Sequence, residues 1–381
     1  MWNTGHKPTV LVVDDAPENL HVIVEALKND YAILTARDGA KALQLVRGGK
    51  LPDIILLDVV MPGMDGYEVC RALKDDSTTR EIPVIFVTSL AESQEEALGL
   101  TMGAVDYITK PFNPAILKAR LANHLALRRA YRDLQRSQAV LAEELAQAAQ
   151  YVASLLPVEL PDGPVRANWR FVPSSSLGGD AFGYHFPDDR HFAFYLLDVC
   201  SHGVGPALLS VQVLHVLHNQ SIPSVDFLDP AQVLAGLNDL FQMDRHNALY
   251  FTMVYGILDS KSRQLTLANA GHPPPLCFGP DGKMLVLRKP NLLIGAMPGV
   301  GYKNLNLTVE PGTSLYLFSD GVYEVQQEDG TYCTYTEFAT SMSTIHCQGG
   351  DVLDAVLAQA RRLGGTAMLK DDFSLLKLQF P

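Results

Sequence analysis

The segment Ile54-Ile55-Leu56-Leu57-Asp58-Val59-Val60-Met61-Pro62-Gly63 decides the fold of the first third of the chain. Four apolar residues precede an aspartate on a tight turn, as expected of a strand that is buried on both faces of a sheet. Four further runs have the same strand-like character: Val10–Val13, Ala32–Ala36, Val84–Val87 and Val105–Ile108. Amphipathic, helix-like stretches lie between them at Pro17–Lys28, Gly39–Arg47, Tyr67–Lys74 and Gln94–Gly103. Five βα units of this spacing predict an α/β doubly wound domain with a five-stranded parallel sheet.

Polar residues follow four of these five strands. They are Asp14 and Asp15, Asp58, Thr88 and Lys110. Ligands in an open α/β sheet bind beyond the carboxyl ends of the strands, so we expect these side chains to converge. Three converging carboxylates repel one another, which predicts a bound Mg²⁺ ion. Asp58 is then the candidate nucleophile toward a phosphoryl group, with Lys110 neutralising the developing charge and Thr88 donating a hydrogen bond.

Four motifs in this region resemble the response-regulator receiver family (CheY-like) over residues 8–126: Val12-Val13-Asp14-Asp15, Leu57-Asp58 through Asp65-Gly66, Val87-Thr88-Ser89 and Thr109-Lys110-Pro111-Phe112. The resemblance implies that a sensor histidine kinase or phosphotransfer protein phosphorylates Asp58. It also implies that the backbone carbonyl of Val60 joins Asp14, Asp15 and Asp58 around the metal. Thr88 and Tyr107 would move on activation, although plain packing beneath a helix is the alternative for Tyr107. The Lys110–Pro111 peptide bond would be cis.

A long stretch without proline or glycine runs from about Ala115 to Leu156. Within it, one set of positions recurs at alternating intervals of four and three residues: Leu127, Tyr131, Leu134, Gln138, Leu141, Leu145, Ala148, Val152 and Leu155. This heptad seam predicts an α-helical coiled-coil linker over residues 127–156 and a homodimer formed through it. A single amphipathic helix packed on its own domain is the alternative.

Residues 157–381 have strands in groups and helices apart from them. The apolar, strand-like runs are Phe192–Leu197, Phe251–Leu258, Leu265–Ala268, Ser314–Phe318 and Phe373–Leu378. Helices are expected at Pro206–His218, Ala231–Arg245 and Val352–Leu363. This order predicts an α+β domain, a β-sandwich with flanking helices. The chain therefore divides into three expected domains, at residues 1–126, 127–156 and 157–381.

Aspartates in four turns carry the chemistry of this last domain. The turns contain Asp180, Asp198, Asp320 and the pair Asp371-Asp372. An aspartate in a turn is more often structural, but Asp198 and Asp320 each end a strongly apolar strand, where a carboxylate is desolvated unless a cation is present. Four such carboxylates suit two Mn²⁺ or Mg²⁺ ions. A hydroxide that bridges two metals is an in-line nucleophile toward a phosphoester.

These turns, together with Asn269-Ala270-Gly271-His272-Pro273-Pro274, resemble the metal-dependent type-2C protein phosphatases of the SpoIIE branch over about residues 157–381. The resemblance implies that Asp180 and Asp198 bridge the metals, that the Val199 carbonyl completes one shell, and that Asp320 and Asp371 hold one metal. Asp372 would be an additional ligand or a support for the ligands. The implied substrate is a phosphoserine or phosphothreonine of a STAS-type anti-sigma-factor antagonist.

Two positions depart from that phosphatase pattern. Gly183 stands where many members carry another acid, and Ser201 stands where glycine usually precedes His-Gly. The first departure affects at most an auxiliary metal site, and the second strains a turn if its φ is positive. His272 is expected to shape the site, with proton donation as the alternative.

Composition limits the remaining function classes. A net charge of −12 argues against a nucleic-acid surface, and five scattered cysteines indicate reduced thiols. No apolar run reaches the length of a membrane span, and residues 1–7 lack a signal-peptide core, so a cytoplasmic protein is expected.

The sequence predicts a response regulator whose phosphorylation at Asp58 controls a serine/threonine phosphatase. The alternative is a catalytically weak pseudophosphatase that binds a sigma factor or related regulator.

Overall fold

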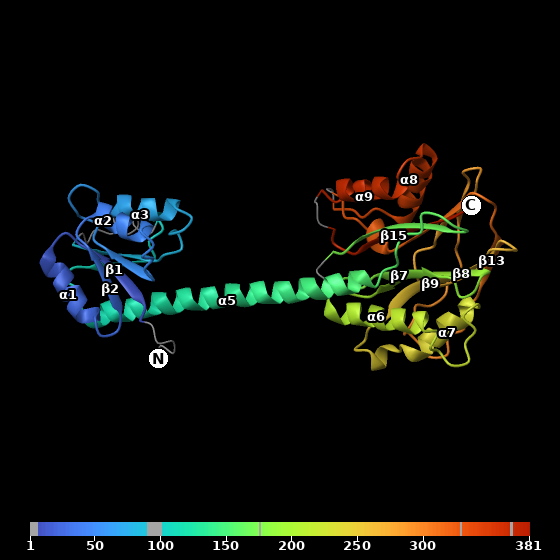
Figure 1. Ribbon diagram of the computed structural model, residues 1–381, viewed down its shortest axis with the longest axis horizontal. Helices are drawn as coiled ribbons and strands as arrows, with labels where there is room; N and C mark the ends of the chain where they lie inside the picture. Colours follow the sequence, from blue (N-terminus) through green and yellow to red (C-terminus); the bar gives the residue numbers. More distant parts are fainter. Residues whose placement is uncertain (1–6, 90–100, 175–176, 328–329, 366–368) are drawn as a thin grey trace. The chain divides into compact units, whose positions relative to one another are not determined.

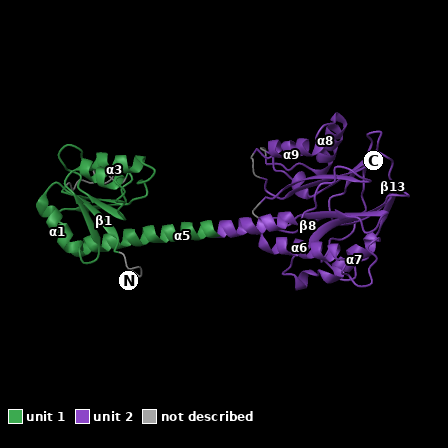
Figure 2. Ribbon diagram, viewed as in Figure 1, with its two compact units in different colours: residues 1–140 green, residues 141–381 purple. Residues whose placement is uncertain are grey.

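Parallel strands form the centre of the N-terminal part of the computed structural model, which describes residues 7–89, 101–174, 177–327, 330–365 and 369–381. The chain divides into unit 1, residues 1–140, and unit 2, residues 141–381 (Figure 2). The sheet of unit 1 has the order β2-β1-β3-β4-β5 with every pair parallel. Its strands are β1 (Thr9–Val13), β2 (Ala32–Ala36), β3 (Ile54–Leu57), β4 (Val84–Thr88) and β5 (Asp106–Thr109). The predicted five-stranded parallel sheet is confirmed.

Helices cover both faces of this sheet (Figure 1). They are α1 (Pro17–Leu27), α2 (Gly39–Arg47), α3 (Gly66–Asp75) and the start of α5 (Pro114–Ser154). Successive residues of β1 alternate between two cores: Leu11 and Val13 pack with α2 and α3, whereas Val10 and Val12 pack with α1 and α5. The helix expected over residues 94–103 lies almost wholly outside the described residues.

The linker stretch forms one continuous helix, α5, of 41 residues. Leu117, Leu121 and Leu125 are buried in unit 1, so the first turns of α5 complete the core of that unit. Beyond them most heptad positions are solvent-exposed in the single chain, with exposed fractions of 69% for Leu127 and 55% for Leu134, whereas Leu145 and Val152 are half-buried. None of the helices in the described part of the chain has the length and apolarity that a membrane crossing requires.

Two antiparallel five-stranded sheets face each other in unit 2. One has the order β13-β10-β9-β8-β7 and the other β12-β11-β14-β15-β6. Their strands are β6 (Arg166–Val172), β7 (Ala181–His185), β8 (His191–Val199), β9 (Phe251–Asp259), β10 (Gln264–Ala270), β11 (Leu276–Phe278), β12 (Met284–Val286), β13 (Leu305–Thr308), β14 (Thr313–Phe318) and β15 (Phe373–Phe380). Phe182 and Phe194 of one sheet pack with Leu315 and Leu376 of the other.

Helices flank the two sheets on their outer faces. Helices α6 (Val204–His218) and α7 (Pro230–Leu240) pack on the first sheet, and α8 (Tyr335–Gln348) and α9 (Val352–Leu363) pack on the second (Figure 1). The predicted β-sandwich with flanking helices is therefore confirmed.

One predicted helix was wrong in extent. The helix expected over Ala231–Arg245 ends at Leu240, and only Met243–Arg245 form a further 3-10 turn. The buried Phe241 leaves helical geometry, and the Met243 amide donates to the Gly295 carbonyl instead of to the helix. The helical pattern continues in the sequence, but packing against the Gly295 segment ends the helix.

Candidate functional site

Two buried aspartates and a lysine meet at the carboxyl ends of the strands in unit 1. The Lys110 Nζ atom lies 2.6 Å from Asp14 Oδ2 and 2.6 Å from Asp58 Oδ2. Asp14 is 1% exposed and Asp58 is 6% exposed. The structure thus brings together three of the residues predicted to act here, because β1, β3 and β5 all end at the same edge of a parallel sheet.

Burial governs the protonation of this cluster. It raises the pKa of Asp58 above its ordinary value, although the hydrogen bond from Lys110 opposes the shift. For Lys110, burial works to lower the pKa, but its hydrogen bonds to Asp14 and Asp58 outweigh that effect and raise it. Lys110 therefore stays charged between the two carboxylates.

The carboxylates of unit 1 lie close enough to share one cation. Ligand oxygens of Asp14, Asp15 and Asp58 all lie within 4.8 Å of one another, and Asp15 is exposed to solvent. Oxygen donors at this spacing fit Mg²⁺, which keeps several of its waters. Val60 follows in the same loop, where its backbone N–H lies 3.4 Å from Asp58 Oδ1.

The loop after Asp58 is held close to the start of α3. A side chain on Gly66 would place its Cβ 2.2 Å from the Asp58 carbonyl oxygen, so only glycine fits there.

Of the two predicted switch residues, Thr88 is fully buried at the end of β4, and Tyr107 is buried in the core beside Phe86. The Lys110–Pro111 bond is cis, as expected from the resemblance.

Five aspartates of unit 2 gather from strand ends of both sheets. Asp180 directly precedes β7 and Asp198 lies at the end of β8, while Asp320 follows β14 and Asp371 and Asp372 precede β15. Within the described residues none of these carboxylates pairs with a lysine or arginine.

Burial, with repulsion from neighbouring aspartates, raises the pKa of four of these carboxyl groups: Asp180, Asp198, Asp320 and Asp371. Burial, then the charges of Asp320 and Asp371, raises the pKa of Asp198 to about 8. Burial and the Asp371 charge raise the pKa of Asp320 to about 6. The pKa of the fully buried Asp180 is raised by burial and by Asp198. These acids are more widely spaced than those of unit 1, which alone among the described residues place three ligand atoms within 4.8 Å of one another. Carboxylates with raised pKa values and no lysine or arginine partner are nevertheless a donor set that suits divalent cations.

Asp372 differs from the other four because both of its carboxylate oxygens accept hydrogen bonds from backbone amides. Its Oδ1 accepts from the Ser174 amide at 2.8 Å, and its Oδ2 accepts from the Gly179 amide at 2.7 Å. A Cβ on Gly178 would lie 2.2 Å from Asp372 Oδ2. The geometry favours Asp372 as the anchor of the turn that presents Asp180, rather than as a metal ligand.

A cleft of about 410 Å³ opens beside these acids and is lined by Asp198, Asp320 and His272. His272 is 4% exposed, and its Nδ1 lies 2.8 Å from the Thr252 hydroxyl. Burial lowers the pKa of His272 to about 3, so the imidazole is neutral near pH 7. A neutral ring cannot supply a proton as an imidazolium, which supports the shaping role over proton donation.

Sequence reasoning missed two residues of this site. Arg288 lines the same cleft with its guanidinium 5.3 Å from the centre of the Tyr335 ring, in cation–π geometry. Ser374 donates a hydrogen bond of 2.6 Å to Asp180 Oδ2. Side chains alternate between the two faces of a sheet along β15, and this alternation predicts the face on which Ser374 lies. Nothing in the sequence around Arg288 indicates that this residue lies near the aspartates.

Comparisons with protein families give a match for each of the two units. Residues 188–381, just over half of the chain, match the model described as stage II sporulation protein E (SpoIIE). Residues 10–122 match the response regulator receiver domain. The SiaA-PP2C domain of Pseudomonas aeruginosa has a similar fold, with a TM-score of 0.54 and 22% identity, over 64% of this chain and 99% of that one.

Curated relatives share a smaller part of their length. A probable cyclic di-GMP phosphodiesterase of Vibrio cholerae is 42% identical over 121 residues, 32% of this chain and 27% of that protein. The response regulator PleD of Caulobacter vibrioides is 49% identical over 113 residues, 29% of this chain and 25% of that protein. The chain thus spans about a quarter of the length of these relatives.

The turn between Asp198 and α6 contains a strained serine that gives a stability prediction. Ser201 has a φ of 71°, in the left-handed region that favours glycine. We expect Ser201→Gly to stabilise unit 2 by about 1 kcal/mol, because strain of this kind costs on the order of 1 kcal/mol. Scanning calorimetry would then show a melting temperature about 2–4 °C higher.

The matched control for this measurement is Ser221→Gly. Ser221 is also exposed, but its φ is not positive, so the added chain freedom should leave stability unchanged or lower. Equal effects of the two substitutions would contradict the assignment of strain to Ser201.

Proposed function

The chain belongs to the SpoIIE family and carries a receiver domain, and on this basis we propose that phosphorylation of Asp58 controls a metal-dependent serine/threonine protein phosphatase. The observation that carries the proposal is a set of carboxylates in unit 2, with Asp180 buried and Asp198 and Asp320 half-buried, that lack a lysine or arginine partner among the described residues. A carboxylate removed from water needs positive charge nearby, which Lys110 contributes in unit 1 and no lysine or arginine among the described residues contributes to these acids.

In this proposal Asp180, Asp198, Asp320, Asp371 and the Val199 carbonyl hold two Mn²⁺ or Mg²⁺ ions. Bound ions supply a hydroxide nucleophile near neutral pH and stabilise charge on the phosphoryl oxygens. The chain's own residues orient this centre: Ser374 fixes Asp180 by a hydrogen bond of 2.6 Å, and Asp372 anchors the turn before it. His272 shapes the cleft as a neutral ring.

The receiver site acts on a different phosphoryl group. Asp58 accepts it from a sensor histidine kinase or phosphotransfer protein, in a site where Asp14, Asp15, Asp58 and the Val60 carbonyl hold Mg²⁺. Lys110, which contacts Asp58 at 2.6 Å, balances the charge of the acyl phosphate. Thr88 and Tyr107 are the proposed switch residues, and α5 continues from unit 1 into unit 2 as the connection between them.

The proposed substrate is a phosphoserine or phosphothreonine on a STAS-type anti-sigma-factor antagonist in the cytoplasm. The proposed domain boundaries are residues 1–126 for the receiver, 127–156 for the linker and 157–381 for the phosphatase. Both proposals rest on the SpoIIE family membership and on the position of α5 between the two folds.

The central prediction concerns catalysis and its control. We expect the full chain to hydrolyse a phosphoserine peptide with Mn²⁺ and to lose activity with EDTA. Asp198→Asn should reduce kcat at least about a hundredfold, because a carboxylate that would hold the metal ions is lost. Beryllofluoride, a phosphoryl analogue, should change the rate in the native chain but not in Asp58→Asn.

The outcomes separate the two candidate functions. Hydrolysis that survives Asp198→Asn would contradict the assigned centre. Absence of hydrolysis with either metal, with and without beryllofluoride, would favour the pseudophosphatase that binds a sigma factor or related regulator.

Arg288 gives a second prediction, because it is the cation that lines the acidic cleft. We propose that its guanidinium binds the substrate phosphate, since arginine matches phosphate oxygens with two parallel hydrogen bonds. Arg288→Ala should lower kcat/KM for a phosphopeptide about tenfold to a hundredfold, mostly through KM. Arg288→Lys should recover only part of the loss. The control is Arg245→Ala, an exposed arginine outside the cleft, and equal kinetics of the two alanine variants would contradict the role.

The exposed heptad seam gives a third prediction. We propose that α5 pairs with α5 of a second copy, because burial of Leu127, Tyr131, Leu134 and Leu141 would remove four exposed apolar side chains from water. Replacing Leu134 and Leu141 by glutamate should convert a dimer to a monomer in light scattering. Ala139→Glu, which lies outside the seam on the same helix, should leave the dimer intact; a dimer that survives the double change would contradict the seam.

A further inference from the structure

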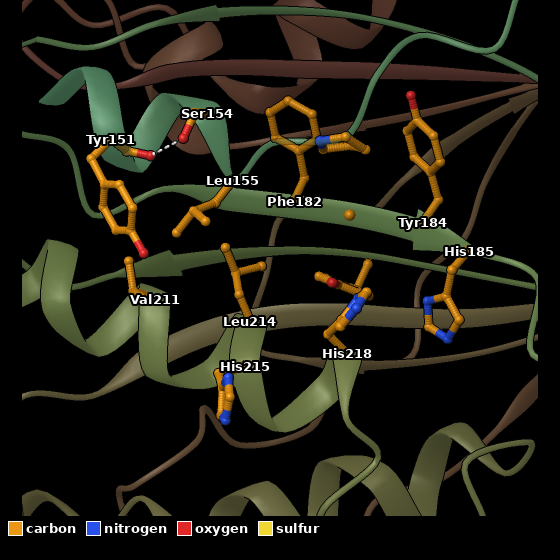
Figure 3. Close-up of a pocket in the computed structure, with 13 residues that line it drawn as sticks. Tyr151, Ser154, Leu155, Phe182, Tyr184, His185, Val211, Leu214, His215 and His218 are labelled. Carbon is orange, nitrogen blue, oxygen red and sulfur yellow. Dashed lines mark hydrogen bonds between the residues drawn. The ribbon is translucent and has the colours of Figure 1, made fainter.

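A second cavity lies within unit 2 beside the edge strand β7, and its lining includes none of the metal-binding aspartates. Its volume is about 500 Å³, within the usual range of small-molecule sites. Figure 3 shows Tyr151, in the last turn of α5, and Leu155, just after that helix, across from Val211 and Leu214 of α6. His185 and His218 lie farther along the same cavity (Figure 3).

Two polar groups of this cavity make no hydrogen bond among the described residues. The Nε2 atom of His185 is buried and unpartnered. Tyr195 lines the same cavity, its side chain is 5% exposed, and no hydrogen bond of its hydroxyl is found in the described part of the chain. Because a buried polar atom without a partner is unfavourable, a ligand that satisfies His185 Nε2 would bind favourably.

Gly183 makes room for the Tyr195 hydroxyl. A Cβ at position 183 would lie only 2.4 Å from Tyr195 Oη, so a larger residue would displace the ring. The departure from the phosphatase pattern at Gly183 therefore has a structural counterpart: the missing side chain lets the tyrosine present its hydroxyl to the cavity.

The polar side chains of this lining share one property, which is that each can donate a hydrogen bond. They are Tyr151, Ser154, Tyr184, His185, Tyr195, His215 and His218, and the lining includes no aspartate, glutamate, lysine or arginine. The remaining walls are aromatic or aliphatic, with Phe182, Leu155 and Leu214 among them. A flat apolar body with an acceptor at one end complements this surface.

Two of these groups are already engaged within the chain. The Ser154 hydroxyl donates a hydrogen bond to the Tyr151 carbonyl, and the Tyr184 hydroxyl donates one to the Val158 carbonyl. His185 and Tyr195 are therefore the groups on which a ligand site can be argued.

We propose that this cavity binds a small aromatic molecule that carries a carboxylate or similar oxyanion. Tyr195 and His185 donate to the oxyanion, and the aromatic body packs against Phe182, Leu155 and Leu214. Because the ligand would contact both the end of α5 and α6, it would hold these two helices together. Helix α6 begins at Val204, shortly after Asp198, so the ligand would also brace the helix that follows the metal-binding turn.

Calorimetric titration of the full chain with 2-naphthoate and with 2-naphthamide tests this site. We expect saturable one-to-one binding of the acid with a Kd below about 1 mM, a value that a ligand of this size can reach. The amide has the same ring but no charge and should bind at least about tenfold more weakly. Absence of saturable binding of the acid, or equal affinity of the two probes, would overturn the proposal.

Three variants locate the binding. Val211→Trp should fill the cavity and abolish binding, whereas His185→Phe and Tyr195→Phe keep a ring in place and should each weaken it about tenfold. His246→Phe, at a histidine outside the cavity, should bind as the native chain does. Unchanged affinity in all three cavity variants, with native melting temperatures, would refute the site. The binding readout does not depend on phosphatase activity, so its failure is distinct from failure of the proposed function.

Discussion

Repulsion between buried carboxylates is the constraint on which both halves of this chain depend. In unit 1 the charges of Asp14 and Asp58 are balanced by Lys110, which contacts both at 2.6 Å. In unit 2 no lysine or arginine among the described residues pairs with Asp180 or Asp198, and their pKa values rise through burial and through the charges of neighbouring aspartates. Lys110 thus supplies part of the positive charge in unit 1, whose acids are also spaced for a metal ion, whereas the acids of unit 2 have no such side chain beside them.

Much of unit 2 serves to hold its acids in place. Asp372 accepts backbone hydrogen bonds at both carboxylate oxygens, and the Ser319 hydroxyl donates to the Asp372 carbonyl oxygen at 3.0 Å. The same Ser319 hydroxyl accepts from the Ser374 amide, which ties β14 to β15 just where Asp320 and Asp371 emerge. Buried, satisfied networks of this kind fix side chains that would otherwise move apart.

Helix α5 takes part in the packing of both units. The first turns of α5 are part of the core of unit 1 through Leu117 and Leu121, and its last turn lines the cavity of unit 2 through Tyr151. One continuous element thus takes part in the packing of each unit. A ligand in the cavity and a phosphoryl group on Asp58 would both act on residues of this helix or its neighbours.

The local pattern of apolar residues was enough to predict the strands and the polar residues at their ends. The apolar runs around Ile54–Leu57 specify the parallel sheet, and strand-end residues such as Asp58 and Asp198 follow directly from them. Contacts between distant segments decided the rest: α7 ends at Leu240 because residues near Gly295 take its hydrogen bonds, and Asp372 anchors a turn that lies 193 residues earlier in the chain. The spacing of apolar residues predicts which face of a helix or strand is buried. A hydrogen bond between distant segments, or the position of Arg288 in the cleft, arises only when the two sheets pack together.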